Sequence, residues 1–197
     1  MDDIVRQAMA KWPNVPHCYG WLGLDARGHW YMRDDRTQAT GPFAASDGGT
    51  PDSKGAVLRH DKLIDFIHRN YDCDDAGQWY FQNGPQRVYV ELEATPWVMR
   101  IDDALAVHSH TGRAAQVRAA LTDEQGRVYL DTDIGLGLAH TLDVGLAARA
   151  IESGLWPLAE ARSSDLPQRF GYVRSPQAQR AGATAAAMGA SANKKPA

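Results

Sequence analysis

Gly28-His29-Trp30-Tyr31-Met32 is the first of three similar stretches in this chain, and the others are Gly77-Gln78-Trp79-Tyr80-Phe81 and Gly126-Arg127-Val128-Tyr129-Leu130. Each contains, in order, a glycine, a polar residue, a bulky apolar residue, a tyrosine and a second bulky apolar residue. Glycine adopts a positive φ without steric cost, and side chains alternate between the two faces of a strand. Each stretch therefore predicts a β-hairpin with two side chains in the core and its tyrosine on the other face.

The spacing of the three stretches leaves two interpretations open. The glycines are 49 residues apart, both from position 28 to 77 and from 77 to 126. In the first interpretation the three copies arose by convergence, because hairpin turns favour such residues for local reasons. Alternatively, they mark a structural duplication, which would place Tyr31, Tyr80 and Tyr129 at related positions.

Sequence on either side of these hairpins predicts further strands and a few helices. Apolar residues at helical spacing predict amphipathic helices over residues 2–12, 59–71 and 143–153. Strands are expected over 87–93, 97–101 and 117–121, and in 87–93 the alternation predicts one buried and one solvated face. Residues 34–55 are rich in glycine, proline and polar residues, which indicates a long connecting loop.

Together these segments predict an α+β fold of mostly antiparallel β-hairpins with two or three packed helices. We expect two small lobes. The predicted divisions are an N-terminal helix and loop (1–16), a β-rich lobe with one helix (17–99), a second such lobe (100–174) and a disordered tail (175–197). The tail is alanine-rich and has no apolar face to bury.

Composition excludes several classes of partner. The chain has 197 residues, a formal net charge of -3 and a pI near 6.1, which argue against binding to nucleic acid or anionic membranes. No stretch is long and apolar enough to suggest a membrane span, so a cytoplasmic location is expected. The two cysteines, Cys18 and Cys73, are too few for a disulfide framework and are not spaced as a redox or zinc pair.

The order of motifs resembles an uncharacterised proteobacterial family, domain of unknown function 1285. Its Gly-x-Trp strand is matched by Gly28-His29-Trp30, its arginine before an apolar helix by Arg59, and its Asp-x-x-Gly turn by Asp74 to Gly77. Residues 86–97 match its Glu-Arg-Val-x-Ile-x-Val-Glu-Asp-x-Pro-Phe run, with Gln86, Ala94 and Trp97 as departures. The similarity covers roughly residues 21–100, and residues 34–55 are longer than the family's connection. The resemblance implies a distant relative with a two-lobed α+β fold and no assigned activity.

Candidate ligand-binding residues lie on the face of the 87–93 strand expected to be solvated. Arg87, Tyr89 and Glu91 combine both charges with an aromatic ring, which suits a polar ligand or the edge of a partner. The repeated tyrosines join them, so the candidate set is Tyr31, Tyr80, Arg87, Tyr89, Glu91 and Tyr129. The alternative is an ordinary solvated strand face.

Three histidines are the remaining candidates for chemistry. His108 and His110 would point to one side of a strand, and His140 would be a third ligand for zinc or another divalent metal. A polar loop near Gly112 is the competing interpretation. No nucleophile elbow, dinucleotide fingerprint or other catalytic motif is present in the sequence, and no cofactor is expected.

The sequence therefore favours a non-enzymatic module that binds a protein partner or a small molecule. The alternative is a metal-dependent enzyme with a histidine-based site. Neither hypothesis has a decisive motif.

Overall fold

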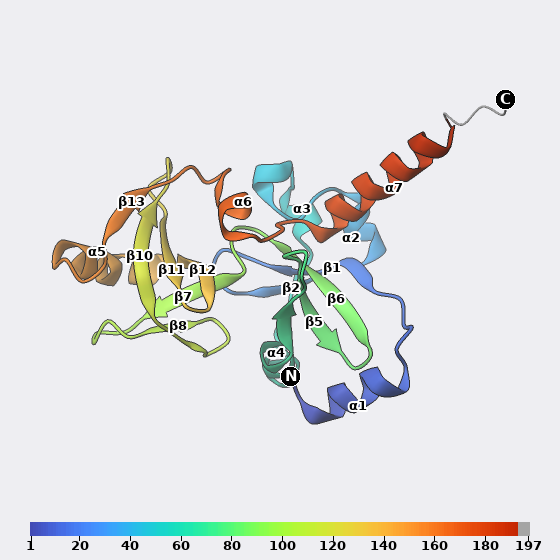
Figure 1. The fold of residues 1–197 in the computed structure, drawn as a ribbon, viewed down its shortest axis with the longest axis horizontal. Coiled ribbons are helices and arrows are strands. Elements are labelled where there is room, and N and C mark those ends of the chain that lie inside the picture. The colour runs from blue at the N-terminus through green and yellow to red at the C-terminus, as the bar shows by residue number, and fades with distance from the viewer. Residues whose placement is uncertain (193–197) are drawn as a thin grey trace.

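The computed structural model describes residues 1–192 and has an α+β fold with two mostly antiparallel sheets (Figure 1). The predicted fold class is confirmed. Among the described residues, no helix is both long and apolar enough to cross a membrane.

The first sheet is built from the N-terminal half of the chain. It has the order β3-β2-β1-β6-β5-β4. Its strands are β1 (Cys18–Leu24), β2 (Trp30–Met32), β3 (Ala56–Val57), β4 (Tyr71–Cys73), β5 (Trp79–Asn83) and β6 (Gln86–Leu92). Helices α1 (Asp3–Lys11) and α4 (Asp61–Arg69) agree with the predicted amphipathic helices, and α4 directs its fully buried Ile67 into the core.

The second sheet has the order β13-β10-β11-β12-β7-β8-β9. Its strands are β7 (Trp97–Ile101), β8 (Val107–Ser109), β9 (Ala114–Ala115), β10 (Val117–Thr122), β11 (Val128–Thr132), β12 (Gly135–Ala139) and β13 (Leu158–Glu160). The predicted third helix is α5 (Val144–Glu152), preceded by the 3-10 turn η2 (Thr141–Asp143). The short helix α6 (Leu166–Phe170) follows β13.

The two sheets share one topology. In each, a hairpin begins with a strand that pairs in parallel with the last strand of a three-stranded antiparallel meander: β1 with β6, and β7 with β12. The strand order β3-β2-β1-β6-β5-β4 of the first sheet corresponds, strand by strand, to the order β9-β8-β7-β12-β11-β10 in the second. The β4–β5 turn at Gly77 is therefore equivalent to the β10–β11 turn at Gly126. By the same correspondence, the turn at Gly28 is equivalent to the β7–β8 turn at Leu105.

An aspartate organises each of the three turns found in the sequence. One carboxylate oxygen of Asp25, Asp74 and Asp123 accepts hydrogen bonds from the backbone N–H groups two and four residues ahead, at 2.8–3.0 Å. Asp102 makes the same pair of bonds before Leu105, which has a φ of 64° where the other turns have glycine. Aspartate favours such turns because its side chain satisfies backbone donors locally.

One hydrophobic core joins both sheets. At its centre Trp30, Tyr71 and Trp97 pack edge to face, with ring centroids 5.3 Å apart for Trp30 and Tyr71 and 5.4 Å for Tyr71 and Trp97. Trp30 and Tyr71 belong to the first sheet and Trp97 to the second, so the aromatic contacts bridge the two sheets. Burial of such large rings makes this contact a main source of stability.

Residues 34–55 are more ordered than the predicted loop. They contain α2 (Asp35–Ala39), the 3-10 turn η1 (Ala45–Asp47) and α3 (Pro51–Lys54). Asp34 and Thr50 cap the two α-helices with their side chains. The segment folds back on Arg33, which is 1% exposed and donates to the carbonyl oxygens of Gly20, Gly41 and Ser53. The buried guanidinium supplies contacts that the local sequence pattern does not reveal.

The expected solvated face of β6 is instead covered. Tyr89 and Glu91 are each only 3% exposed. Helix α7 (Pro176–Ala192) begins at this face, and Glu91 accepts hydrogen bonds from the Ser175 hydroxyl and the Gln177 backbone N–H. From there α7 projects away from the body of the molecule (Figure 1). The sequence predicted a disordered tail from residue 175, of which residues 193–197 lie outside the described part.

Candidate ligand-binding site

A large cavity lies beside the first hairpin turn, and we name it the hairpin cleft. It has a volume of about 800 Å³ and is formed by the β1–β2 turn, the end of α3, β3, the start of α4 and the chain after β6. The turn also abuts the second sheet, because a Cβ on Gly28 would lie 2.9 Å from the Cβ of His110. The residues that line the cleft are Asp25, Ala26, Arg27, His29, Tyr31, Lys54, Val57, Leu58, Arg59, Asp61, Ile64 and Glu93.

The two inner carboxylates of the hairpin cleft are already bonded within the protein. Asp25 accepts the turn N–H groups with one oxygen, and its other oxygen lies 3.1 Å from Nδ1 of His29. Glu93 accepts the Ala26 N–H at 2.8 Å and two bonds from Nζ of Lys54, at 3.0 and 3.1 Å. These carboxylates therefore brace the cleft rather than offering free negative charge.

Tyr31 and Lys54 form the polar floor beside these carboxylates. Nζ of Lys54 lies 5.0 Å from the centre of the Tyr31 ring, a cation–π arrangement. Burial raises the pKa of Tyr31, and the negative charge of Asp25 raises it further, so the hydroxyl is neutral at physiological pH. The Tyr31 hydroxyl is thus a hydrogen-bond donor at the floor of the cleft, close to the carboxylate of Asp25.

Two arginines at the hairpin cleft have no carboxylate partner. Among the described residues, neither Arg27 nor Arg59 forms an ion pair, and both are exposed. Asp61 is the lining carboxylate without an ion pair, and it lies in the first turn of α4, where negative charge stabilises a helix. Val57, Leu58 and Ile64 add apolar surface. The cleft therefore combines free guanidinium groups with an apolar wall.

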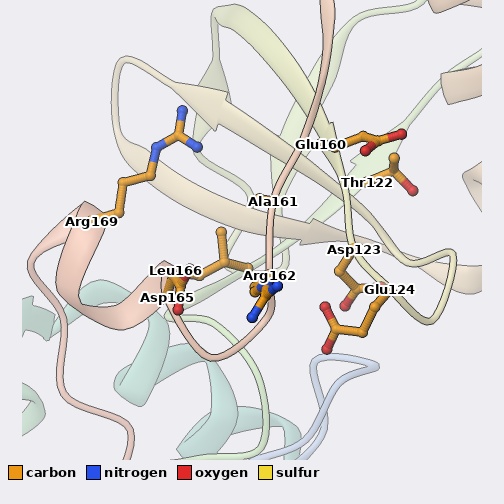
Figure 2. Close-up of a pocket in the computed structure, with 9 residues that line it drawn as sticks. All are labelled: Thr122, Asp123, Glu124, Glu160, Ala161, Arg162, Asp165, Leu166 and Arg169. Carbon is orange, nitrogen blue, oxygen red and sulfur yellow. The ribbon is translucent and has the colours of Figure 1, made fainter.

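A second cavity, of about 560 Å³, lies beside the turn at Gly126 (Figure 2). Two of its four carboxylates have structural partners that lie outside their own turn N–H groups: Asp123 accepts from Arg127 and from the Tyr129 hydroxyl, and Glu124 accepts from the backbone and hydroxyl of Ser163. Figure 2 shows Arg169 directed away from the acidic side chains. Arg162 and Arg169 also line this cavity, and neither forms an ion pair among the described residues.

Three of the predicted ligand-binding residues, Tyr80, Arg87 and Tyr89, lie together on the first sheet. With their neighbours they form a cluster that we name the tyrosine face: His17, Tyr19, Tyr80, Arg87, Tyr89 and Arg180. Tyr80 and Tyr89 are directly paired across β5 and β6. Tyr19 stacks on Tyr89 with centroids 4.5 Å apart and an interplanar angle of 16°. The guanidinium groups of Arg87 and Arg180 lie over the Tyr80 and Tyr19 rings, at 4.4 and 4.5 Å.

The other predicted tyrosines are not part of this cluster. Tyr31 lines the hairpin cleft. Tyr129 is 2% exposed and donates its hydroxyl hydrogen to Asp123 at 2.8 Å, so it braces the Gly126 turn. Glu91 caps α7, as described above. The six candidates are thus distributed over several sites.

The three candidate metal-binding histidines are not brought together. His108 is exposed on β8, and His140 caps the 3-10 turn η2 through Nδ1. His110 packs among the rings of Trp30, Tyr71 and Trp97, where burial lowers its pKa to about 3. Across the described residues, no group of three His, Cys, Asp or Glu side chains has an arrangement suited to a metal ion.

Sequence reasoning missed most of the hairpin cleft. Asp25 lies in a pattern typical of a hairpin turn, which does not indicate a cavity beside it. Lys54 lies in the segment predicted as a loop, and its partner Glu93 is 39 residues away in the sequence. Two lining residues are indicated by the sequence: Tyr31, as one of the repeated tyrosines, and Arg59, by its place before an apolar helix.

Comparison with solved structures finds two proteins of the DUF1285 family. The protein from Silicibacter pomeroyi DSS-3 is 12% identical, with a TM-score of 0.43, covering 75% of this chain and 83% of that chain. The protein from Shewanella baltica OS155 is 17% identical, with a TM-score of 0.41, covering 66% of this chain and 91% of that chain. No curated protein matches the sequence.

A family model covers most of the chain. It is DUF2944, described as "Protein of unknown function (DUF2946)", and it matches residues 1–177. This match confirms the prediction that the chain is related to an uncharacterised family. The chain belongs to the DUF2944 family of proteins of unknown function.

Proposed function

We propose that this protein is a non-enzymatic binding module and that the hairpin cleft binds a small organic anion. The observation that carries the proposal is the pair Arg27 and Arg59, which have no carboxylate partner among the described residues while Asp25 and Glu93 are internally bonded. A guanidinium group binds carboxylate or phosphate through two parallel hydrogen bonds.

The ligand class follows from the remaining lining. The Tyr31 hydroxyl and the Lys54 ammonium supply further donors, and the apolar side chains of Val57 and Ile64 suit a hydrocarbon or aromatic body. A volume of about 800 Å³ is within the range of small-molecule sites. We therefore expect a ligand with one or two anionic groups attached to an apolar body.

Calorimetric titration with benzoate and phenyl phosphate tests this proposal, with neutral benzamide as the comparison ligand. We expect binding of one or both anions and no measurable binding of benzamide. Replacing one charge-assisted contact, in R27Q or R59Q, should weaken affinity about tenfold.

R118Q is the matched control, because Arg118 is an exposed arginine on β10 of the other sheet. It should bind the anions as the wild type does. Equal binding of benzamide, or affinities unchanged in both R27Q and R59Q, would rule the proposal out.

A further inference from the structure

The tyrosine face lies apart from the hairpin cleft and shares no lining residue with it. It combines residues from β1, β5, β6 and α7 with His17, which precedes β1. We infer that the tyrosine face binds an acidic peptide segment of a partner protein, whose carboxylates bond to Arg87 and Arg180.

The first argument is the way in which the two arginines are held. Each guanidinium group rests on a tyrosine ring, Arg87 on Tyr80 and Arg180 on Tyr19, and the Tyr19 ring is in turn stacked on Tyr89. Stacking restrains the long side chain and leaves its N–H groups, which lie in the guanidinium plane, available to an acceptor. A carboxylate that binds there incurs little of the usual entropy cost of ordering an arginine.

The second argument is the local charge. Neither Arg87 nor Arg180 forms an ion pair with any carboxylate in the described part of the chain. The pKa of His17 is lowered first by burial and then by the positive charges of Arg87 and Arg180, so both guanidinium groups act on the same small region. Asp74 also lies nearby, but the turn N–H groups and the Tyr89 hydroxyl bond its carboxylate.

The third argument is shape. A wide, open cavity of about 510 Å³ lies between Tyr19 and the first turns of α7. Ala181, Thr184 and Ala185 line its helical side, and their small size lets a peptide backbone approach closely. Helix α7 lines one side of this open cavity. The helix then projects away from the body of the molecule (Figure 1).

The basic surface is also short, which favours a peptide over nucleic acid. Exposed Asp72 and Asp75 lie on either side of the bonded Asp74, and the whole chain has a net charge of -3. Nucleic acid needs a continuous basic path along its phosphates. Arg87 and Arg180, which stack on tyrosine rings, can instead bind a few carboxylates of an acidic peptide segment.

Fluorescence anisotropy with a fluorescein-labelled hexaglutamate peptide tests the inference on the full chain at low ionic strength. We expect saturable binding that weakens with added salt, no binding of labelled hexalysine, and weaker or no binding of labelled dT6. R87Q and R180Q should each weaken hexaglutamate binding about three- to tenfold, and the double variant should weaken it further.

R118Q again serves as the control and should bind hexaglutamate as the wild type does. Circular dichroism should show that all variants are folded, since both arginines are at the surface and neither has an ion pair to lose. The inference is overturned if the wild type does not bind hexaglutamate, if R118Q weakens binding as much as R87Q and R180Q do, or if dT6 binds more tightly than hexaglutamate.

Discussion

Gly77 and Gly126 have the same backbone conformation in different surroundings. Their φ angles are 77° and 74°, in the left-handed region that side chains with a Cβ rarely adopt. A Cβ on Gly77 would lie 2.3 Å from the carbonyl oxygen of Gly171, whereas a Cβ on Gly126 would meet nothing within 4 Å. Topologically equivalent residues thus differ in how strictly the fold requires glycine.

This difference predicts unequal costs of the same substitution. Gly126→Ala should reduce the free energy of unfolding by about 1 kcal/mol, from backbone strain alone. Gly77→Ala should cost at least twice as much, because the segment that donates Val173 N–H to the Gly77 carbonyl must move. Urea denaturation of the two variants measures both values, and equal costs would contradict the role given to the Gly171 contact.

At the scale of elements, the C-terminal segment depends on one buried carboxylate. Glu91 caps the start of α7, and Arg174 next to this cap donates to Asp47 of the 3-10 turn η1. Beyond Gln177, the side chains from 178 to 186 are all exposed, so little packing supports the helix. An exposed alanine-rich helix of this length is marginal in water, and its attachment point is therefore decisive.

Glu91→Ala should release α7 from the first sheet. Two hydrogen bonds to a buried carboxylate are lost, so we expect destabilisation of about 1–2 kcal/mol and faster tryptic cleavage after Arg180. Mass spectrometry of a digestion time course measures the cleavage rate. Glu152→Ala, at the exposed end of α5, is the control, and a cleavage rate in Glu91→Ala equal to that control would contradict the anchoring role.

At the scale of the whole molecule, the two sheets are joined through an aromatic core that includes an imidazole. The ring centre of His110 lies 5.6 Å from that of Trp30 and 5.9 Å from that of Trp97, and its Nε2 has no hydrogen-bond partner among residues 1–192. Its Nδ1 accepts the Val98 N–H at 3.3 Å. Protonation would place an unpaired charge between the sheets, which burial disfavours.

Stability should therefore decrease as the pH falls below 6.5. Above that value His110 is neutral in both states; below it the unfolded chain takes up a proton, while the folded protein does not until about pH 3. Each pH unit between 6.5 and 3 should cost up to about 1.4 kcal/mol for this group.

Urea denaturation at several pH values between 6.5 and 4.5 measures the slope. His110→Asn keeps an acceptor for Val98 and does not titrate, so its slope should be shallower. His108→Gln, on exposed β8, should behave as the wild type does. A slope in His110→Asn as steep as in the wild type would assign the acid sensitivity to other groups.

Local chemistry in the sequence determined the hairpins, the three amphipathic helices, the α+β class and the family resemblance. These features follow from glycine at turns, aspartate as a turn acceptor and the spacing of apolar residues, all of which act over a few residues. The repeat at Gly126 is recognisable as a sequence pattern. Only the strand order shows that its turn is equivalent to the turn at Gly77, and that the turn at Leu105 is equivalent to the turn at Gly28.

Tertiary structure alone decided where the two proposed binding surfaces lie. Lys54 meets Glu93 across 39 residues of sequence, and Arg180 reaches Tyr19 only because Glu91 anchors α7. The start of α7 covers Glu91, and the rings of His17, Tyr19 and Tyr80 pack around Tyr89, although the alternation of these two residues with apolar ones predicted an open face. Periodicity shows that a strand has two faces but not what covers each, because coverage depends on segments that are distant in the chain and are brought together by the common core.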